Sequence, residues 1–434
     1  MAFSMSLFIA VHTDPAEPIV SHPLEHAFAN MTSQTSPCRQ CAPCSVAEQG
    51  LQRPACPRAQ EDSAKSNNNA DLYTDMSAPS LAQPPPQLSL HVYDLPGKWH
   101  KRLLESHPDC ATYQWAAEVK IPTLLAKHAV SQGSPEDADF HLVPFPAKCY
   151  FNHVADKSRA KMDEVFIEII AFIRHQHPWW AKSDGRDHIF IFPSGIGASM
   201  FPAWRSHIPH SIFLVAEGDR TKDYVNTWKD IIMPGVSDSS LVKGTWKPMG
   251  KRKHLIFFRG KLHSKDTDPQ GHEVKRPLEL RQALARDLGK KTRGEILVTD
   301  AVTNSASYAE EMRDSVFCLC PRGGTPWTRR VFDALLTGCI PVVISDDIEF
   351  PFEDFLPYDK FTIKLSEEQV VKRQDYVEST LREIPQASLE QKLEQIREVR
   401  EVFLYDKGHA LNGILWQLHR KKRRFTHSST NFWT

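Results

Sequence analysis

Residues 317–347, FCLCPRGGTPWTRRVFDALLTGCIPVVISDD, carry the pattern from which we predict the fold of this chain. A short apolar run enters a loop rich in Pro, Gly and Thr, a helical stretch follows, and a Gly-Cys pair leads into a second apolar run. The order strand, helix, strand is the unit from which parallel sheets with helices on both faces are built. The stretch therefore predicts an α/β fold with a parallel sheet around it.

The same alternation continues on both sides of this stretch. Strand-like and helical runs alternate from LSLHVYDLP at residues 88–96 onwards, and the pattern restarts after the polar bridge KGTWKPMGKRK at residues 243–253. A chain of 434 residues is too long for one ordinary core, whereas two α/β domains in tandem fit both its length and its pattern. We therefore predict an N-terminal domain over residues 88–245 and a C-terminal domain over residues 246–385.

The two ends of the chain differ in composition from these domains. Residues 1–87 are rich in Pro, Ser, Gln and Asn without periodicity, which predicts a low-complexity stalk that is mostly disordered. This segment contains four cysteines, Cys38, Cys41, Cys44 and Cys56. Their spacing favours disulfides or disorder over a metal site, because no paired CxxC follows. Residues 386–434 indicate a charged amphipathic helix and a basic tail, HRKKRRF, which either is solvated or contacts an anionic surface.

Charge and hydropathy exclude several classes of partner. Lys+Arg and Asp+Glu both number 53, so the formal net charge is zero and nothing in the composition indicates nucleic acid as a partner. No run approaches the ~18–20 apolar residues that span a bilayer. The start, MAFSMSLFIAV, is apolar but short, and it lacks the basic region of a signal peptide. The sequence thus shows no clear transmembrane anchor.

The loop within residues 317–347 has the features of a diphosphate site. Gly323 and Gly324 break the chain at the carboxyl end of a strand, which is the edge at which open α/β sheets bind ligands. Thr328 is predicted to cap the following helix, and Arg329 opens it. Free backbone N–H groups together with a guanidinium would hold a diphosphate well.

Two further residues fit a nucleotide site. Asp333 lies four residues after Arg329 on the same helical face, where its carboxylate could accept both hydroxyls of a ribose. Arg259 ends the strand-like run HLIFFR, and Gly260 after it permits close approach, so that Arg259 is predicted to be a second phosphate clamp. The alternatives are structural: a turn with an Arg–Asp pair on one helix, and an ordinary surface arginine.

Acidic side chains after two other strands are candidates for chemistry. In SDDIEFPFED, the residues Asp346, Asp347 and Glu349 favour helix capping or sugar contacts over Mg²⁺ or Mn²⁺, since adjacent carboxylates seldom converge on one ion alone. Glu217 and Asp219 follow a strand of the first domain, and either could act as a general base toward an acceptor hydroxyl. The alternative for these two is a turn with an Asp–Arg surface pair.

The remaining patterns mostly exclude functions. Residues 194–199 follow a strand and are predicted to shape an acceptor pocket, whereas Asp187 and His188 precede that strand and are interpreted as structural. No GxGxxG or GxxxxGK[ST] occurs, so that dinucleotide and P-loop sites are weak hypotheses. There is no GxSxG after a strand and no HExxH, which argues against a serine hydrolase or a zinc protease.

Taken together, these segments resemble the exostosin-type glycosyltransferases, in the plant and algal branch of glycosyltransferase family 47. The similarity runs from LSLHVYDLP through GRDHIFIFPSGIGAS, SIFLVAEGDR and FFRG to residues 317–354, and it covers nearly 300 of the 434 residues. The resemblance implies a GT-B architecture, in which two Rossmann-like domains face a cleft. It implies an inverting transfer from a UDP-sugar held by the second domain to a glycan or glycoprotein acceptor, with no metal required.

The resemblance also implies roles for particular residues. Those that match the family's nucleotide-sugar site are Arg259, Arg322, Gly323, Gly324, Thr328, Arg329 and Asp333. Many members carry a His-Asp pair where this chain has Pro193-Ser194, which leaves Asp219 and Glu217, with Arg259, as the catalytic candidates. A glycan-binding protein that has kept the fold but lost the chemistry is the alternative, and a sugar-nucleotide hydrolase or phosphorylase is a third hypothesis.

The setting of the protein is likewise implied by the resemblance. Members of the family are Golgi membrane proteins, and the resemblance leaves open a complex with other glycosyltransferases. A disulfide between Cys110 and Cys149, which flank a helix and a strand of the first domain, would suit a lumenal protein.

Overall fold

The computed structural model describes residues 85, 88–131, 133–262, 278–291, 294–299 and 305–427. Apart from residue 85, the stalk predicted over residues 1–87 lies outside these ranges, and so do its four cysteines. The described part is of the α/β class and contains two five-stranded parallel sheets, as the alternating pattern predicted. The boundaries drawn for the two domains, and the cleft between them, stay predictions.

The first sheet has the strand order β1-β2-β3-β4-β6. Its strands are β1 (Leu90–Val92), β2 (Phe140–Leu142), β3 (His188–Phe192), β4 (Ile212–Val215) and β6 (Ile231–Ile232). Along β3, Ile189 and Ile191 enter one apolar cluster, while Phe190 and Phe192 enter another. The sheet is therefore buried on both faces, which is why its strands are continuous apolar runs in the sequence.

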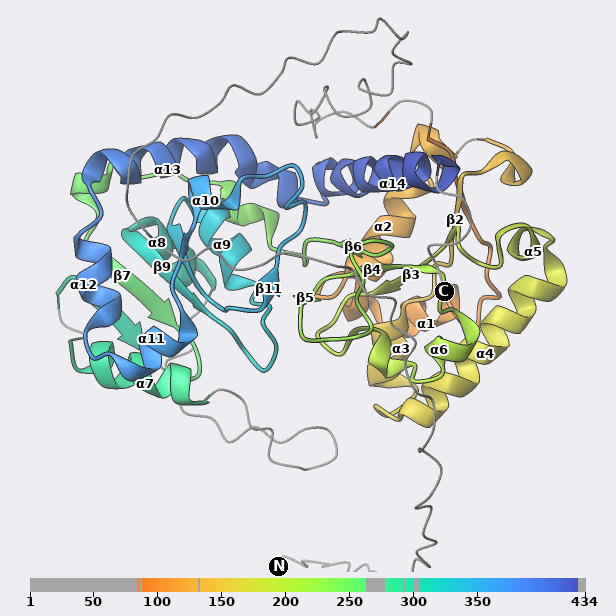
Figure 1. Cartoon of the computed structure of the whole chain (residues 1–434), viewed down its shortest axis with the longest axis horizontal. Coiled ribbons are helices and arrows are strands. Elements are labelled where there is room, and N and C mark those ends of the chain that lie inside the picture. The colour runs from red at the N-terminus through yellow and green to blue at the C-terminus, as the bar shows by residue number, and fades with distance from the viewer. Residues whose placement is uncertain are drawn as a thin grey trace, which may run out of the picture. The chain divides into compact units, whose positions relative to one another are not determined.

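Helices flank this sheet, and Figure 1 shows α4 and α6 beside it. They are α1 (Lys101–Ser106), α2 (Ala117–Leu125), α3 (Ala147–His153), α4 (Arg159–Gln176), α5 (Trp179–Ser183) and α6 (Trp204–His207). Pro122 lies inside α2, and the helix continues through it. The helix is short, and Pro122 removes only the single bond that its N–H would donate to the carbonyl of Glu118.

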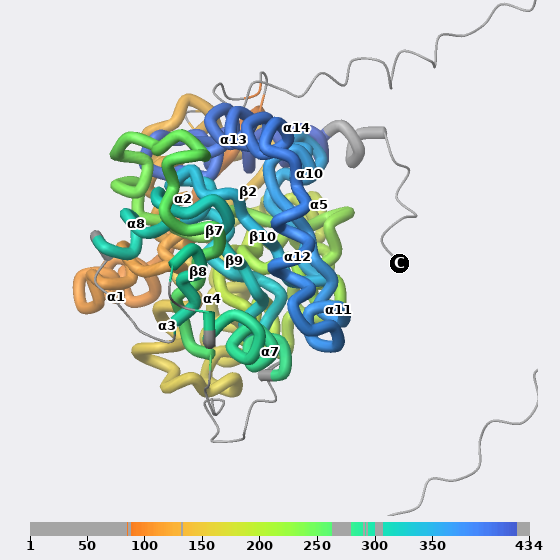
Figure 2. Tube along the Cα trace, turned by 90° about the vertical axis from the view of Figure 1, so that its left-hand side faces the viewer, coloured from red at the N-terminus to blue at the C-terminus, as the bar shows by residue number. Residues whose placement is uncertain are grey.

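The second sheet has the order β12-β10-β9-β7-β8. Its strands are β7 (His254–Arg259), β8 (Ile296–Thr299), β9 (Ser315–Pro321), β10 (Ile340–Ile344) and β12 (Ile363–Lys364). Figure 2 shows β7, β9 and β10 between α8 on one side and α11 and α12 on the other. The helices of this half are α7 (Leu278–Leu288), α8 (Ser305–Arg313), α9 (Arg330–Thr337), α10 (Tyr358–Phe361), α11 (Glu367–Lys372), α12 (Tyr376–Arg382) and α13 (Gln386–Val399).

Two disulfides occur in the described residues. The bond between Cys110 and Cys149 confirms the pairing suggested by the resemblance. The second bond, between Cys318 and Cys339, joins β9 to the residue before β10 and was not predicted. The register of the two strands explains it, because Pro341 of β10 lies opposite Cys318, so that Cys339 enters β10 close to its partner.

Backbone and side-chain contacts join residues of the two predicted domains. The strands β5 (Gly218–Asp219) and β11 (Ile348–Glu349) form a two-stranded antiparallel sheet. The last helix, α14 (His409–His427), includes the whole of HRKKRRF, the run predicted as a basic tail. Its Lys421 is only 3% exposed and donates to the carbonyls of Thr227 and Trp228. The alternative of a wholly solvated tail is therefore wrong, because the helix packs its lysine against backbone carbonyls.

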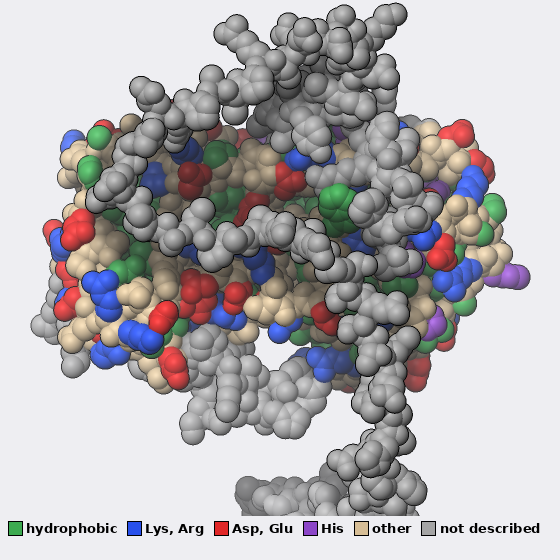
Figure 3. Space-filling model, in the orientation of Figure 1, with side chains coloured by type: hydrophobic (Ala, Val, Ile, Leu, Met, Phe, Trp, Pro, Cys, Tyr) green, Lys and Arg blue, Asp and Glu red, His purple; other side chains and the backbone are tan. Residues whose placement is uncertain are grey.

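The surface is mixed in charge. In the part of the face in Figure 3 that is not grey, acidic and basic side chains are interspersed, in keeping with the net charge of zero. None of the helices in the described ranges combines the length with the apolar character that crossing a membrane requires.

Candidate functional site

The strand order of the second sheet creates a switch point between β7 and β9. From β7 the chain moves to β8 on one side, whereas β9 and then β10 lie on the other side. In open parallel sheets, ligands bind outside the carboxyl ends of the strands at such a point. Here those ends carry Arg259 on β7 and the loop of residues 322–329 after β9. The structure therefore brings two of the predicted nucleotide-binding segments to one edge of the sheet.

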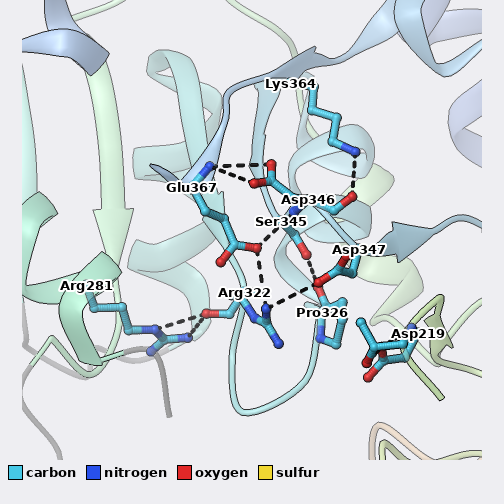
Figure 4. Close-up of polar contacts among 10 residues, drawn as sticks. Asp219, Arg281, Arg322, Pro326, Ser345, Asp346, Asp347, Lys364 and Glu367 are labelled. Carbon is cyan, nitrogen blue, oxygen red and sulfur yellow. Dashed lines mark hydrogen bonds and ion pairs between the residues drawn. The ribbon is translucent and has the colours of Figure 1, made fainter. Parts of the chain in front are cut away.

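Arg322 begins this loop and keeps unused donors. Its backbone N–H donates to the carbonyl of Ile344 at 3.0 Å, which anchors the start of the loop to β10. Its Nη1 lies 3.5 Å from Glu367 Oε1 and 3.9 Å from Asp347 Oδ2, and Figure 4 shows these three side chains converging. Its Nε is buried and has no hydrogen-bond partner in the described part of the chain. A guanidinium that is half paired in this way retains capacity for an anionic ligand.

Thr328 is not the cap that the sequence predicted. The helix α9 begins at Arg330, its N-cap residue is Arg329, and no side chain caps it. The backbone of Arg329 is already helical, and its carbonyl accepts from the N–H of Asp333 at 3.1 Å. Thr328 is therefore one residue too early, and its side chain is buried.

Asp333 is buried and paired within its own helix. Its Oδ2 lies 3.3 Å from Nε of Arg329, so the structure shows the Arg–Asp pair that the sequence allowed as an alternative. Burial raises the pKa of the Asp333 carboxyl, and the positive charges of Arg329 and Arg330 oppose that rise. The guanidinium of Arg329 is about half exposed, with 47% of its side chain accessible. A role for Asp333 in holding ribose stays a prediction.

Arg259 is held by a partner of its own. Its Nε and Nη2 donate to the two carboxylate oxygens of Glu311 at 2.5 and 2.6 Å, and Nη1 donates to Thr299. The adjacent Gly260 does allow a close approach, but by Arg330, whose Nη2 would lie 2.3 Å from a Cβ at that position. Arg330 in turn donates to the carbonyl of Arg259 at 2.8 Å. The contacts at this strand end thus fix Arg330, and the guanidinium of Arg259 is not free to bind a phosphate.

Glu217 brings the first half of the chain to this loop. It follows β4, is 6% exposed, and receives a side-chain hydrogen bond from Thr325 of the loop. Gly195 lies so close that a Cβ there would meet Glu217 Oε1 at 2.2 Å. Burial raises the pKa of Glu217 to about 7; the bond from Thr325 opposes this rise and the charge of Asp219 adds to it. Its Oε2 has no hydrogen-bond partner among the described residues.

Asp219 is fixed more tightly than Glu217. Its Oδ1 accepts from the backbone N–H and the hydroxyl of Thr221 at 3.0 and 2.6 Å. Its backbone pairs with Ile348 in the sheet of β5 and β11, and the next residue, Arg220, donates its N–H to the carbonyl of Asp347. Figure 4 shows Asp219 beside Asp347 and Pro326. Both catalytic carboxylates predicted from the sequence therefore lie next to the loop of residues 322–329.

The acidic residues that follow β10 contact several different partners. Asp346 accepts from the backbone N–H of Glu367 and so caps α11, while the carboxylate of Glu367 accepts from the N–H of Asp346 at 2.9 Å. Asp347 faces Arg322, and Glu349 lies 3.8 Å from Arg220. These contacts match the capping role that the sequence favoured for Asp346.

Sequence reasoning missed Thr325, Glu367 and the exact role of Gly195. Thr325 appeared only as a residue of a loop, and Glu367 lies 45 residues after the Arg322 that it contacts. Gly195 belongs to the segment predicted to shape an acceptor pocket, and its carbonyl accepts from the hydroxyl of Tyr224 at 2.9 Å. These contacts depend on how the segments that follow β3, β4 and β9 come together in space, which the sequence does not specify.

Asp187 and His188, interpreted as structural, form a chain of hydrogen bonds in which His188 bonds Asp187 and Tyr93, each at 2.7 Å.

Comparison with known proteins supplies independent information. Residues 84–381 match the family model described as the Exostosin GT47 domain. A probable glucuronosyltransferase of Oryza sativa subsp. japonica is 29% identical over 307 residues, which is 69% of this chain and 68% of that protein. Another from the same organism is 30% identical, covering 67% and 69% of the two chains. A probable beta-1,4-xylosyltransferase of Arabidopsis thaliana is 26% identical, covering 71% and 76%.

Proposed function

The chain belongs to the exostosin GT47 family of glycosyltransferases, and from that premise we propose that it moves a sugar from a UDP donor to a glycan or glycoprotein acceptor with inversion at the anomeric carbon. One observation carries the proposal: the Thr325 hydroxyl of the arginine-bearing loop hydrogen-bonds to the buried carboxyl of Glu217. A diphosphate site and a candidate base thereby lie in contact, although they come from strands of different sheets.

Arg322 is proposed to bind the donor. Its buried Nε without a partner and the backbone N–H of Gly324 are the proposed donors to a diphosphate, whereas the N–H of Gly323 already donates to the carbonyl of Thr325 at 3.0 Å. Its Glu367 contact is long, at 3.5 Å, and is weak enough to yield to a doubly charged ligand. Arg259 is assigned a positioning role, because its side chain is paired with Glu311 and its carbonyl holds Arg330.

Glu217 is proposed to be the general base. An acceptor hydroxyl attacks the anomeric carbon, the bond from that carbon to the diphosphate oxygen breaks, and Oε2 of Glu217 takes the hydroxyl proton. A carboxylate with a pKa of about 7 is matched to this task near neutral pH. The charge that develops on the leaving diphosphate falls to Arg322 and the loop N–H groups, which is the electrostatic contribution that usually dominates such catalysis.

The proposal includes a GT-B cleft, a Golgi setting and no required metal ion. The family and the two parallel sheets support the architecture. The named activities of the relatives direct attention to UDP-glucuronic acid and UDP-xylose as the first donors to examine.

Product analysis tests the proposed function. The full chain is incubated with a panel of UDP-sugars and oligosaccharide acceptors, and UDP release and the lengthened acceptor are both measured, with and without EDTA. We expect one donor to give equal amounts of UDP and product, and EDTA to leave the rate unchanged. UDP release that is independent of acceptor would instead indicate a sugar-nucleotide hydrolase, and sugar binding without UDP release would indicate a glycan-binding protein.

A further inference from the structure

Two histidines and an aspartate lie together at the surface of the first half of the chain. His107 precedes the 3-10 helix η2 (Pro108–Ala111), Asp109 lies within it, and His153 ends α3. One nitrogen of each imidazole and a carboxylate oxygen of Asp109 all lie within 4.8 Å of one another. His153 Nε2 is 3.5 Å from Asp109 Oδ2, and the two imidazole rings stack with their centroids 4.3 Å apart.

A disulfide holds the two segments that carry these side chains. Cys110 follows Asp109 directly, and its buried partner Cys149 lies one helical turn before His153 on the same face of α3. The Cα atoms of the two cysteines are 5.7 Å apart. The relative position of Asp109 and His153 is therefore fixed covalently, so that little backbone freedom is lost when a ligand joins their side chains.

We propose that His107, Asp109 and His153 form a binding site for a divalent transition-metal ion, with Zn²⁺ as the reference ion. Two imidazoles and a carboxylate are ligands that Zn²⁺ takes at about 2.0–2.2 Å, and three protein ligands leave a fourth position for water. Tetrahedral bonds of that length place ligand atoms roughly 3.3 Å apart. The three side chains are at least partly exposed, and rotation about their χ angles closes the remaining gap without moving the backbone.

A second set of ligands shares His153 and must be separated from the first. The sulfur atoms of Cys110 and Cys149 lie within the same 4.8 Å of a His153 nitrogen. These sulfurs are joined in a disulfide and offer no thiolate, which is the form of cysteine that binds metal. In the oxidised protein the proposed ligands are therefore the two imidazoles and the carboxylate.

Metal titration of the oxidised full-length protein, without an affinity tag, tests the proposal. The protein is stripped with a chelator, the disulfide is checked by thiol titration, and Zn²⁺ binding is followed by calorimetry at pH 7.5 and 5.5. We expect a saturable site whose affinity falls at least about tenfold in His153→Ala and in His107→Ala, while the control His175→Ala binds as the wild type does. Binding should weaken at pH 5.5, since protonated imidazole cannot coordinate.

Thermal unfolding with Zn²⁺ gives a second readout, because Zn²⁺ raises the Tm only where it binds the folded chain more tightly than the unfolded chain. Zn²⁺ should raise the Tm of the wild type and of His175→Ala, and this shift should be lost in His153→Ala. Equal Zn²⁺ affinity and equal Tm shifts in the wild type and His153→Ala would overturn the proposal. Binding that appears only after reduction would overturn it too, because the ligands would then be the cysteines.

Discussion

Two buried glutamates, Glu118 and Glu217, each have a pKa raised to about 7, with burial as the largest cause. The oxygens of Glu118 accept from the hydroxyl of Tyr113 and from the N–H groups of Lys148 and Cys149 at 2.8–3.0 Å. Glu217 has Thr325 as a donor, and its Oε2 has no partner among the described residues. A similar pKa therefore accompanies a fully used carboxyl at one site and an available acceptor at the other.

The substitution Glu217→Gln should stabilise the protein at high pH. The folded pKa of about 7 exceeds the ordinary value of 4.5, so folded Glu217 keeps a proton that the unfolded chain releases between these pH values. Stability is therefore lost as pH rises through this window, and a glutamine avoids the loss. We expect a gain of up to about 3 kcal/mol at pH 8 that vanishes near pH 4.5.

Urea unfolding of the wild type and Glu217→Gln at pH 4.5 and pH 8 measures this difference. The matched control is Glu118→Gln, which should lower the stability of the protein at pH 8. The NH₂ group of the new glutamine would face one of the three donors whose hydrogen bonds Glu118 accepts. A Glu217→Gln variant that is less stable than the wild type at pH 8 would show that the carboxylate of Glu217 is paired with a group other than those described above.

The pH dependence of transfer follows from the same group. A general base must be ionised, so kcat/KM should fall by about tenfold per pH unit below an apparent pKa near 7 and level off above it. The profile is measured with saturating donor and low acceptor, and stability is checked at each pH. A flat profile between pH 5.5 and 8 would remove Glu217 from the role of base.

At the residue scale, sequence reasoning found positions more readily than partners. Arg259 and Glu217 were named because they stand at or after the carboxyl ends of predicted strands, which indicate a binding edge, and Arg322 was implied by the family resemblance. The pairing of Arg259 with Glu311, 52 residues away, could not be read from the sequence, because a bidentate contact depends on where α8 packs beside β7. The residues named were therefore near the site, whereas the role of each one depends on packing.

At the scale of elements, the disulfide between Cys318 and Cys339 ties β9 to the start of β10. It closes a loop with a sequence separation of 21 residues that includes α9 and the whole loop of residues 322–329, which is proposed to bind the diphosphate. Chain-entropy arguments give about 3 kcal/mol for a loop of this size. We expect the double substitution Cys318→Ala and Cys339→Ala to lower the free energy of unfolding by roughly 2–4 kcal/mol.

Denaturant unfolding of this double variant, with and without reductant, checks the expectation. Reductant breaks both of these disulfides in the wild type but only the bond between Cys110 and Cys149 in the variant, so it should destabilise the wild type more, and the two proteins should have similar stability in reductant. A variant as stable as the oxidised wild type would mean that packing of the buried β9–β10 pair alone determines the geometry of the loop.

Elements with a clear apolar period were the easiest to predict from the sequence. The strands β3, β4, β7, β9 and β10 are apolar runs bounded by polar or turn residues, and each was identified near its observed bounds. Capping was harder: Thr328 has the right chemistry for an N-cap, but the chain at Arg329 is already helical. The Cys318–Cys339 bond was missed because it depends on the register of two strands, which a single sequence does not specify.

At the scale of the whole described fold, α14 contacts segments that lie next to strands of the first sheet. Lys421 donates to the carbonyls of Thr227 and Trp228, each at 2.9 Å, and Lys422 pairs with Asp139. A basic run near a terminus usually indicates a solvated segment, and nothing in the residue pattern indicates that the carbonyls of residues 227 and 228 accept from it. The fold class was predictable, whereas this long-range contact was not.

The substitution Lys421→Met keeps the apolar stem and removes the ammonium. Two carbonyls would lose a charged donor that is itself only 3% exposed, and we expect a cost of about 1–3 kcal/mol in the free energy of unfolding. The matched change Lys422→Met should cost less, because Lys422 is itself nearer to solvent, with 36% of its side chain exposed. Equal effects of the two changes in urea unfolding would indicate that α14 is not held through Lys421.

We propose that Arg322 and Glu217 act in one site, where Arg322 binds the donor and Glu217 is the general base. The most direct test measures the UDP Kd by calorimetry, and kcat for transfer, in Arg322→Ala, Glu217→Gln and the surface control Glu168→Gln. We expect Arg322→Ala to weaken UDP binding by about 10–100-fold. Glu217→Gln should leave UDP binding nearly unchanged and lower kcat by about 10²–10⁴-fold. Wild-type UDP affinity in Arg322→Ala, together with wild-type kcat in Glu217→Gln, would contradict the account.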